Sequence, residues 1–581
     1  MVSNPTGVYQ LHAWDVLTGR LIELTHEPNG RLFALLAPDG RHVYSFVDQE
    51  GSERGHYVRL PLDGGAEIDL TPELPPYTSL DLTLAGASPR GCFTYADADG
   101  YHVYRLDQLD TDGPVVRDLT TRDRPLTRPT LSADGAYLAV AVAQTPSRTY
   151  DSVVILDTDT AEEVGRMDAD PHTSLQPILF APAPDDPRLL VTSNRTGWLR
   201  PLLWNIRLDV HQDLLLGELE GDVVPLDWSS DGREILLRQW LRAEQQLYVY
   251  EVKPGRLRRL DHPSGSFGFS VSFFTDSGAY LAPSGEIFAL WSDVASAPRL
   301  IGLDHNSGRQ TRIVLDVGTA PPGRPWRSVT FPSSDGQLVQ GWLGTPGGAG
   351  PWPAIVQAHG GPNVVTADSF SASVQAWLDN GFAVLSVNYR GSTTFGRQFE
   401  EAILGRPGYW EVEDLVAAHR WLVTQGLADP ARVFVEGWSY GGLLVLLALG
   451  TYPTLWAGGV ARVAIGDCVA AYEDSPAWLQ RGIARRFGGT PDEQPMAWAE
   501  GSPTTYAERL TAPVLVIQGR NDARCPPRQM ERYAARLEAL GKPIDIHWLD
   551  TGHVGPRALA EQAIRFQELM LDWSARWIDQ E

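Results

Sequence analysis

The chain is organised around the stretch Gly437-Trp438-Ser439-Tyr440-Gly441-Gly442. Residues 432–436 before it read Arg-Val-Phe-Val-Glu, a β-branched and aromatic run that is typical of a buried strand. Residues 443–449 after it are rich in helix formers and too short to cross a bilayer, which indicates a buried helix. The stretch therefore predicts a strand–turn–helix unit with a serine at its turn.

The spacing of the glycines around Ser439 indicates a sharp turn with a reactive serine. Gly437 and Gly441 flank Ser439 at two-residue distance, because larger side chains would collide in so sharp a turn. The turn also places Ser439 at a helix N-terminus, where free N–H groups and the helix dipole stabilise negative charge. Strand, serine and helix in this order predict the nucleophile elbow of an α/β-hydrolase. The alternative is a glycine-rich turn whose serine has no chemical role.

Length, charge and cysteine content exclude several classes of protein. A chain of 581 residues exceeds a single core, so we expect at least two domains. The net charge of -24 argues against nucleic acid or an anionic membrane surface as a partner. We expect no transmembrane helix, since no run of about 18 apolar residues occurs, and no secretory signal. The three cysteines are too scattered for a disulfide framework or a cysteine-based zinc site, so we expect a cytoplasmic protein without metal or cofactor.

The first half of the chain is repetitive and rich in strand signals. Turn signals recur about 44 to 52 residues apart, which is the period of a four-stranded propeller blade. They are Pro38-Asp39-Gly40, Pro89-Arg90-Gly91, Ala133-Asp134-Gly135, Asp185-Asp186-Pro187, Ser230-Asp231-Gly232 and Asp276-Ser277-Gly278. A hairpin closes each repeat, and the hairpin at residues 12–19 belongs to an incomplete repeat before the first turn signal. We predict a seven-bladed β-propeller, with six blades as an alternative and a pair of β-sandwiches as the competing architecture.

The sequence pattern changes after a linker rich in glycine and proline at residues 317–325. Beyond it, short strand-like runs alternate with longer helical patterns, which predicts a mostly parallel sheet covered by helices. Strands are expected at residues 353–358, 383–387 and 513–517, and helices at residues 412–424, 528–540 and 557–577. The predicted domains are therefore a β-propeller over residues 1–320 and an α/β-hydrolase domain over residues 321–581.

A nucleophilic serine needs a base to take its proton and a carboxylate to orient that base. In an α/β-hydrolase the acid and then the histidine follow the serine along the chain, on loops after late strands. Asp522 follows the strand at residues 513–517, and His553 follows the expected strand at residues 544–549. We therefore predict a Ser439–His553–Asp522 catalytic triad.

Other residues could fill these roles. Asp467 also follows an expected strand, at residues 459–465, and is the alternative acid. His547 lies inside a strand and His419 is expected on a helix surface, so both suit a structural role better. The second oxyanion donor should come from a loop after an earlier strand, and His359-Gly360-Gly361-Pro362 supplies one. We expect the Gly361 and Tyr440 N–H groups to form the oxyanion hole.

Five motifs of the second half together resemble the prolyl oligopeptidase family of serine peptidases, most closely its acylaminoacyl-peptidase branch. They are His359-Gly360-Gly361-Pro362, Asn388-Tyr389-Arg390-Gly391-Ser392, Gly437-Trp438-Ser439-Tyr440-Gly441-Gly442, Asn521-Asp522-Ala523-Arg524 and Gly552-His553. The resemblance implies a seven-bladed propeller that covers the catalytic cleft and admits short or unfolded peptides. It also implies an acyl-enzyme intermediate. We expect the N-terminus to lack the leading helix that some of these peptidases carry.

Arg524 separates the subclasses of this family. In members similar to acylaminoacyl peptidases, an arginine two residues after the aspartate lines the substrate site, so Arg524 is expected to contact a carbonyl or carboxylate of the peptide. The alternative is a surface arginine paired with Asp522 or Glu531. Dipeptidyl peptidase IV relatives share the serine motif but hold a free amino terminus with paired glutamates on the propeller. We expect no Glu-Glu pair in residues 1–320, which disfavours a dipeptidyl peptidase.

The expected activity is hydrolysis of short peptides with release of N-acylated amino acids from blocked N-termini. An oligopeptidase, carboxypeptidase or dipeptidyl peptidase of the same family remains an alternative, as does an esterase that uses the same triad. A propeller interaction module with a vestigial hydrolase is the alternative from another class. Short peptides are the expected partners, and a homo-oligomer is left open.

Overall fold

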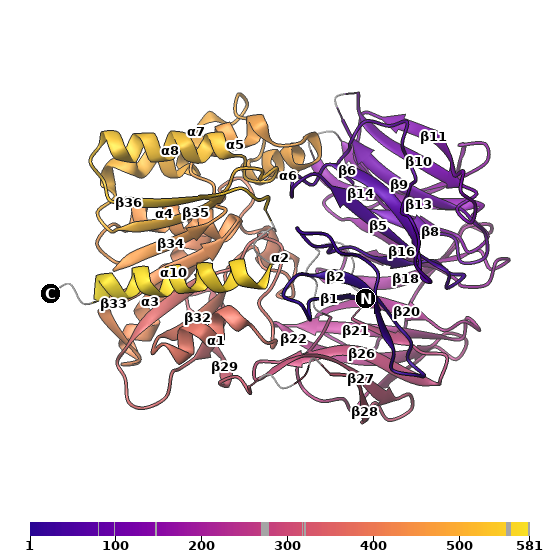
Figure 1. Ribbon diagram of the computed structural model, residues 1–581, viewed down its shortest axis with the longest axis horizontal. Coiled ribbons are helices and arrows are strands. Elements are labelled where there is room, and N and C mark those ends of the chain that lie inside the picture. Colours follow the sequence, from indigo (N-terminus) through magenta and orange to yellow (C-terminus); the bar gives the residue numbers. More distant parts are fainter. Residues whose placement is uncertain are drawn as a thin grey trace.

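The protein has two domains that lie side by side, a ring of β-sheets and a sheet covered by helices (Figure 1). The structure is a computed structural model of the chain. It describes all residues except 80, 98, 146–147, 269–277, 317, 319–320, 554–558 and 579–581. No helix in this described part has the length and apolar character that a membrane span requires.

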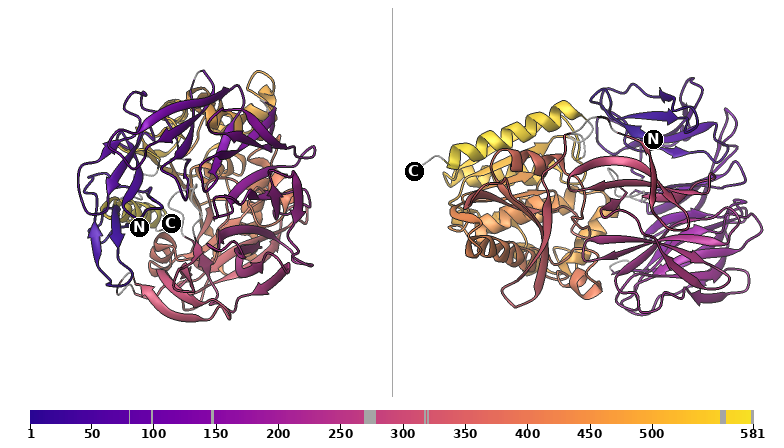
Figure 2. Two further views of the ribbon diagram at one scale, coloured as in Figure 1. Left: turned by 90° about the vertical axis from the view of Figure 1, so that its right-hand side faces the viewer. Right: turned by 90° about the horizontal axis from the view of Figure 1, so that it is seen from below.

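The described residues between 2 and 315 form seven antiparallel sheets arranged in a ring (Figure 2, left). The predicted seven-bladed propeller is therefore confirmed, and the six-bladed and sandwich alternatives are wrong. The blades consist in turn of β1 (Val2–Ser3), β2 (Gln10–Trp14) and β3 (Leu21–Glu23); β4 (Leu35–Leu36), β5 (His42–Asp48), β6 (Gly55–Pro61) and β7 (Ile68–Asp69); β8 (Leu82–Leu84), β9 (Gly91–Ala96), β10 (Tyr101–Asp107) and β11 (Val115–Arg122); β12 (Leu126–Leu131), β13 (Tyr137–Thr145), β14 (Arg148–Asp157) and β15 (Glu163–Met167); β16 (Leu175–Phe180), β17 (Arg188–Ser193), β18 (Arg200–Asn205) and β19 (Val210–Asp213); β20 (Asp222–Trp228), β21 (Glu234–Leu241), β22 (Glu244–Glu251) and β23 (Arg256–Arg259); and β24 (Ser266–Phe267), β25 (Ala279–Leu281), β26 (Glu286–Asp293), β27 (Ser296–Asp304) and β28 (Gln310–Leu315).

The periodic turn signals mark one fixed place in the blades. Those at residues 133–135 and 230–232 join the first and second strands of their sheets, β12 to β13 and β20 to β21. The incomplete N-terminal repeat is the three-stranded blade β1–β3. The signal Asp276-Ser277-Gly278 begins outside the described residues. The period arises because a tight turn must follow each innermost strand before the chain can return outward.

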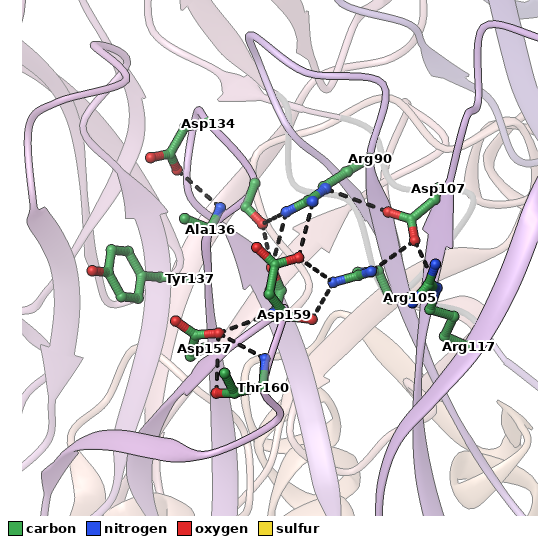
Figure 3. A network of polar contacts seen from close by, with 12 residues as sticks. Arg90, Arg105, Asp107, Arg117, Asp134, Ala136, Tyr137, Asp157, Asp159 and Thr160 are labelled. Carbon is green, nitrogen blue, oxygen red and sulfur yellow. Dashed lines mark hydrogen bonds and ion pairs between the residues drawn. The ribbon is translucent and has the colours of Figure 1, made fainter.

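Turn residues also join neighbouring blades. The Asp157 carboxylate accepts hydrogen bonds from the N–H groups of Asp159 and Thr160, which closes the β14–β15 hairpin. This turn presents Asp159 to Arg90 and Arg105 of the preceding blade, at 2.9 Å and 2.8 Å (Figure 3). A single surface ion pair contributes little, but the Arg105 side chain is only 5% exposed, and both arginines also donate to backbone carbonyls of Gly135 and Thr158. The turn therefore serves the hairpin and the blade interface together.

The second domain is built on one eight-stranded sheet in the order β29-β30-β32-β31-β33-β34-β35-β36. All strand pairs from β32 to β36 in this order are parallel. The strands are β29 (Trp326–Pro332), β30 (Leu338–Gly344), β31 (Trp352–Ala358), β32 (Ala383–Asn388), β33 (Ala428–Trp438), β34 (Gly458–Arg462), β35 (Val514–Gly519) and β36 (Ile544–Leu549). Together with the propeller, this architecture confirms the predicted fold class.

Helices cover both faces of this sheet. Helices α3, α4 and α8 pack on one face, and α1 and α10 pack on the other through Trp377, Leu378 and Trp573. The helices are α1 (Ala372–Asp379), α2 (Arg397–Glu401), α3 (Tyr409–Thr424), α4 (Tyr440–Thr451), α5 (Cys468–Asp474), α6 (Ala477–Phe487), α7 (Pro495–Glu500), the 3₁₀ helix η1 (Pro503–Arg509), α8 (Pro527–Ala539) and α10 (Ala560–Ile578). The helix expected at residues 557–577 begins outside the described residues. Burial on both faces explains why the strands read as continuous apolar runs.

The carboxyl ends of the parallel strands face the propeller. Hairpins between the two central strands of several blades reach the second domain. In the β21–β22 hairpin, the backbone N–H of Arg242 donates to the Thr394 carbonyl at 3.0 Å. In the β17–β18 hairpin, the Gly197 carbonyl accepts from the backbone N–H of Arg397 at 2.9 Å. The β5–β6 hairpin approaches so closely that a Cβ on Gly51 would lie 2.7 Å from the Gly552 nitrogen. The predicted domain division at residue 320 stays a prediction, because residues 317, 319 and 320 of the linker lie outside the described residues.

Candidate active site

Ser439 lies at a strained turn between β33 and α4. Its φ of 58° and ψ of -119° are unusual for a residue with a side chain, and such strain is common at catalytic sites. A Cβ on Gly437 would lie 2.4 Å from the Gly441 carbonyl oxygen, and one on Gly441 would lie 2.1 Å from the Ala358 carbonyl oxygen. Both glycines are therefore required for the turn, as their spacing predicts.

The structure brings the three predicted triad residues together. The Nε2 atom of His553 lies 3.1 Å from the Ser439 hydroxyl, and its Nδ1 atom lies 2.8 Å from Oδ2 of Asp522. His553 is 1% exposed and Asp522 is 3% exposed. The imidazole therefore joins a buried carboxylate to the serine hydroxyl, which is the arrangement that activates a serine nucleophile.

The loop after β35 fixes the orientation of Asp522. Its Oδ1 atom accepts hydrogen bonds from the N–H groups of Arg524 and Cys525, both at 2.8 Å. The carboxylate therefore presents Oδ2 to His553. The alternative acid Asp467 has a different role, since it caps α5 by accepting from the Ala470 N–H at 3.0 Å.

The alternative bases do not reach the serine. His547 lies on β36. The expectation that His419 lies on a helix surface is wrong, because its ring is 4% exposed and packs edge-on against Trp456 at 5.2 Å. His419 is therefore covered by Trp456 from the segment after α4, which the sequence pattern did not indicate.

The glycine loop after β31 lies beside the serine. A Cβ on Gly360 would be 3.4 Å from the Ser439 Cβ, and Gly361 has a φ of 118°, in the region that favours glycine. Among the described residues, no hydrogen bond engages the N–H of Gly361 or that of Tyr440. Both N–H groups are therefore free of protein partners within the described residues, which an oxyanion hole requires of its donors.

Tyr440 and His359 support this region through buried contacts. The Tyr440 hydroxyl donates to Oε1 of Glu411 at 2.6 Å, and burial raises the pKa of Glu411 to about 7. His359 stacks on Tyr389 at 4.3 Å and contacts the Ser392 hydroxyl at 2.8 Å through Nε2. Burial lowers the pKa of His359 to about 4, so its ring stays neutral and serves the structure of the loop.

The Asn388–Ser392 motif anchors the site through Arg390. Its guanidinium, 4% exposed, pairs with the fully buried Asp414 carboxylate of α3 and with Asp335 at 2.7 Å. It also stacks over Trp410 at 4.0 Å. The motif thus connects the end of β32 to the helix that supports the glycine loop and the elbow.

Replacing Arg390 by Met should therefore destabilise the second domain. The change leaves the Asp414 carboxylate buried without its partner, which costs about 3–5 kcal/mol. We expect calorimetry of the full chain to show the melting temperature of this domain lowered by roughly 10 °C. The control is Arg536→Met, which breaks an exposed ion pair with Glu508 and should change stability by less than about 1 kcal/mol. Equal shifts for the two variants would contradict the structural role of Arg390.

Arg524 meets a partner that the sequence did not reveal. Its Nε atom lies 2.8 Å from Oε2 of Glu53, a 7% exposed residue in the β5–β6 hairpin of the propeller. The same hairpin places its Glu50 carbonyl 3.4 Å from the Asn521 side-chain nitrogen. The side-chain partner is therefore the Glu53 carboxylate of the propeller and neither of the predicted partners, Asp522 and Glu531.

The expectation of no Glu-Glu pair in residues 1–320 is wrong, because Glu162 and Glu163 are consecutive. Glu163 lies on the outermost strand β15 of its blade, where it pairs with Arg166 at 2.6 Å. Both residues are exposed. The pair is therefore not part of the site, whereas the single Glu53 is.

Cys525 is a further residue that the sequence analysis missed. It is 1% exposed, and its N–H donates to Oδ1 of Asp522 at 2.8 Å. Burial and the adjacent Asp522 carboxylate raise the pKa of the thiol, so it is neutral and unsuited to act as a nucleophile. One ligand atom from each of Asp522, Cys525 and His553 lies within 4.8 Å of the others, which could hold a metal ion.

The fold and the site together define a class. A strained serine at a strand–helix turn, within hydrogen-bond reach of a buried histidine–aspartate pair, is the constellation of α/β-hydrolases with a Ser-His-Asp triad. Residues 368–581 match the family model described as the prolyl oligopeptidase family. This part of the chain is similar to that family, and four of the five motifs lie within the matched residues.

Curated relatives carry several names within this family. The dipeptidyl peptidase family member 6 of Caenorhabditis elegans is 34% identical over 210 residues, which are 35% of this chain and 28% of that protein. The acylamino-acid-releasing enzyme of Rattus norvegicus is 26% identical over 346 residues, 55% of this chain and 45% of that enzyme. The chain thus spans less than half the length of these relatives.

Solved structures share the whole architecture. The puromycin-hydrolyzing peptidase of Mycobacterium tuberculosis has a TM-score of 0.81 and 20% identity, covering 99% of this chain and 93% of that chain. The acylaminoacyl peptidase of Pyrococcus horikoshii has a TM-score of 0.73 and 17% identity, covering 99% and 92%. These likenesses show that both domains and their fold recur together.

Proposed function

We propose that the protein is a serine peptidase that hydrolyses short peptides and releases N-acylated amino acids from blocked N-termini. The hydrogen-bond chain from Asp522 through His553 to Ser439 is the observation that carries the proposal. Relatives named acylamino-acid-releasing enzymes support the substrate class.

The reaction follows from the positions of these groups. The Ser439 oxygen attacks the scissile carbonyl carbon while its proton moves to Nε2 of His553. The oxyanion lies between the N–H groups of Gly361 and Tyr440, and its collapse breaks the C–N bond as Nε2 returns the proton to the leaving amine. Water then attacks the acyl-enzyme by the same route, with His553 as base. Asp522 holds the proton on Nδ1 and stabilises the imidazolium throughout.

We propose that Arg524 recognises the acyl end of the peptide. It follows the triad aspartate by two residues, its N–H donates to Oδ1 of that aspartate at 2.8 Å, and its side chain is 15% exposed. A guanidinium donates charge-assisted hydrogen bonds to a carbonyl oxygen. The Glu53 carboxylate fixes the orientation of the guanidinium from the propeller side. An N-acyl carbonyl would complete this arrangement.

Replacing Arg524 by Gln should lower kcat/KM for acetyl-alanine p-nitroanilide by about 10–100-fold, mainly through KM. The reason is the loss of a charge-assisted hydrogen bond, which contributes about 1.5–3 kcal/mol. Initial rates over a range of substrate concentrations give the two constants. Arg528→Gln is the matched control, since Arg528 pairs with Glu473 and Asp474 on the surface and should change kcat/KM less than twofold. Equal effects of the two variants would show that Arg524 does not contact the substrate.

A second candidate is a peptidase that holds a free amino terminus. The Glu53 carboxylate within the site favours it, because an ammonium group pairs with a buried carboxylate. Relatives named dipeptidyl peptidases support it as well. In this case Glu53→Gln should weaken cleavage of free peptides and leave acetylated peptides unaffected.

Product analysis separates the candidates. Mass spectrometry of matched acetylated and free tripeptides should show acetyl-amino acids released from the blocked peptide at the higher kcat/KM. A preference for the free peptide would favour the second candidate. A kcat/KM for the matching ester far above that for the peptide would favour an esterase. If a fluorophosphonate failed to label the protein, the serine would not be reactive, and the interaction module would be the remaining alternative.

A further inference from the structure

Three side chains of types that can bind metals lie close together within the candidate active site. Asp522 and Cys525 come from the loop after β35, and His553 comes from the loop after β36. One ligand atom of each lies within 4.8 Å of the others, and all three side chains are buried. One ligand atom from each of the three side chains thus lies near the others, although the residues come from two separate loops.

The chemistry of this set matches one kind of ion. A thiolate, an imidazole and a carboxylate are the ligands that Zn²⁺ combines in proteins, usually in tetrahedral geometry. A sulfur ligand selects against Mg²⁺ and Ca²⁺, which prefer oxygen. The Asp522 carboxylate is also oriented by two N–H groups, as metal-binding carboxylates usually are.

Both nitrogens of His553 already have catalytic partners. Nδ1 faces Asp522 at 2.8 Å, and Nε2 faces the Ser439 hydroxyl at 3.1 Å. A cation on Nε2 would occupy the lone pair that must accept the serine proton. A cation on Nδ1 would displace the Asp522 contact that fixes the tautomer. Metal binding at this cluster is therefore incompatible with general-base catalysis, whichever nitrogen coordinates.

Cys525 distinguishes this cluster from an ordinary triad. The three cysteines of the chain all lie in its described part, and all are buried. Cys92 lies on β9 of the propeller, and the Cys468 thiol donates to the Gly501 carbonyl at 3.2 Å. Cys525 alone among them belongs to the metal-binding cluster.

We propose that Asp522, Cys525 and His553 form an inhibitory site for a thiophilic divalent cation, with Zn²⁺ as the representative ion. This proposal rests on the proposed peptidase function for its effect, though not for the binding itself. On binding, the Cys525 sulfur forms a bond to the cation and its proton passes to solvent. No electron is transferred, so a chelator restores the free enzyme.

The test compares the full-length protein with Cys525→Ser, Cys525→Ala and the matched control Cys468→Ser. Each rate with acetyl-alanine p-nitroanilide is divided by that of the same variant without metal, so differences in basal rate do not enter. We expect Zn²⁺ to inhibit the unaltered protein reversibly. Both Cys525 variants should need at least about tenfold more Zn²⁺, and Cys468→Ser should behave like the unaltered protein. Inhibition of both Cys525 variants at the same concentration of Zn²⁺ would overturn the proposal.

A second readout does not depend on catalysis. Co²⁺ bound to a thiolate gives a sulfur-to-metal charge-transfer band in the near ultraviolet, which should appear with the unaltered protein and be lost in both Cys525 variants. Retention of the band in these variants, or its absence from the unaltered protein, would overturn the site. Its presence without any peptidase activity would show instead that the proposed function is wrong while the metal site stands.

Discussion

Ser439→Ala is expected to lower kcat for acetyl-alanine p-nitroanilide by about four to six orders of magnitude. The variant keeps the oxyanion donors and the substrate site but removes the oxygen that attacks the carbonyl. His553 then has no serine proton to accept, because its Nε2 atom faces that hydroxyl at 3.1 Å. Only the slow direct attack of water on the bound peptide should remain.

The fold should tolerate this change. Alanine keeps the Cβ at a position whose φ is 58°, so the strain of the turn is the same in both proteins. Thermal unfolding should therefore be nearly unchanged, and labelling by a fluorophosphonate should be abolished. Ser373→Ala is a suitable control, since its hydroxyl contacts Gln567 on α10, far from the chemistry. If Ser439→Ala retained rapid turnover, another nucleophile would have to carry the reaction.

Local chemistry made the elbow and the propeller predictable. The spacing of Gly437 and Gly441 follows from contacts of 2.4 Å and 2.1 Å that any Cβ would make, so the sequence must carry glycine there. The blade period follows from turn residues such as Asp134 and Asp231, whose carboxylates accept backbone N–H groups two residues on. In both cases the steric or hydrogen-bonding constraint acts between residues close in sequence, so a single sequence is enough to predict the local structure.

Contacts between the domains could not be predicted in this way. Glu53 and Arg524 are 471 residues apart in the chain, and Glu53 lies in a hairpin turn with a φ of 57° and no repeating pattern. Cys525 looked like an isolated cysteine because His553, which lies near it in space, comes from another loop. The burial of His419 depends in the same way on Trp456 from beyond α4.

The catalytic triad and the partner of Arg524 come from different domains. The triad is assembled within one domain, but the residue that holds Arg524 belongs to the other domain. Chemistry and substrate recognition are therefore separable: a change at the propeller hairpin should alter which peptide is cleaved more than how fast Ser439 reacts. The Glu53→Gln variant described above examines this division.

Asp522→Asn should lower kcat by about four orders of magnitude with little change in structure. The reason lies in the two N–H groups of Arg524 and Cys525, which both donate to Oδ1 at 2.8 Å. An asparagine must place its amide oxygen there, because an NH₂ group cannot accept these bonds. Its NH₂ group then faces Nδ1 of His553 and donates to it.

That hydrogen bond reverses the tautomer of the imidazole. With Nδ1 as acceptor, the ring proton moves to Nε2, which can no longer take the proton of Ser439. Asp467→Asn is the informative control, because Asp467 is the other candidate acid and asparagine also caps a helix well. Steady-state rates with one substrate should show the large loss for Asp522→Asn and less than a twofold change for Asp467→Asn. The reverse order would mean that the carboxylate orienting His553 during catalysis is not the one that contacts it at 2.8 Å in the structure.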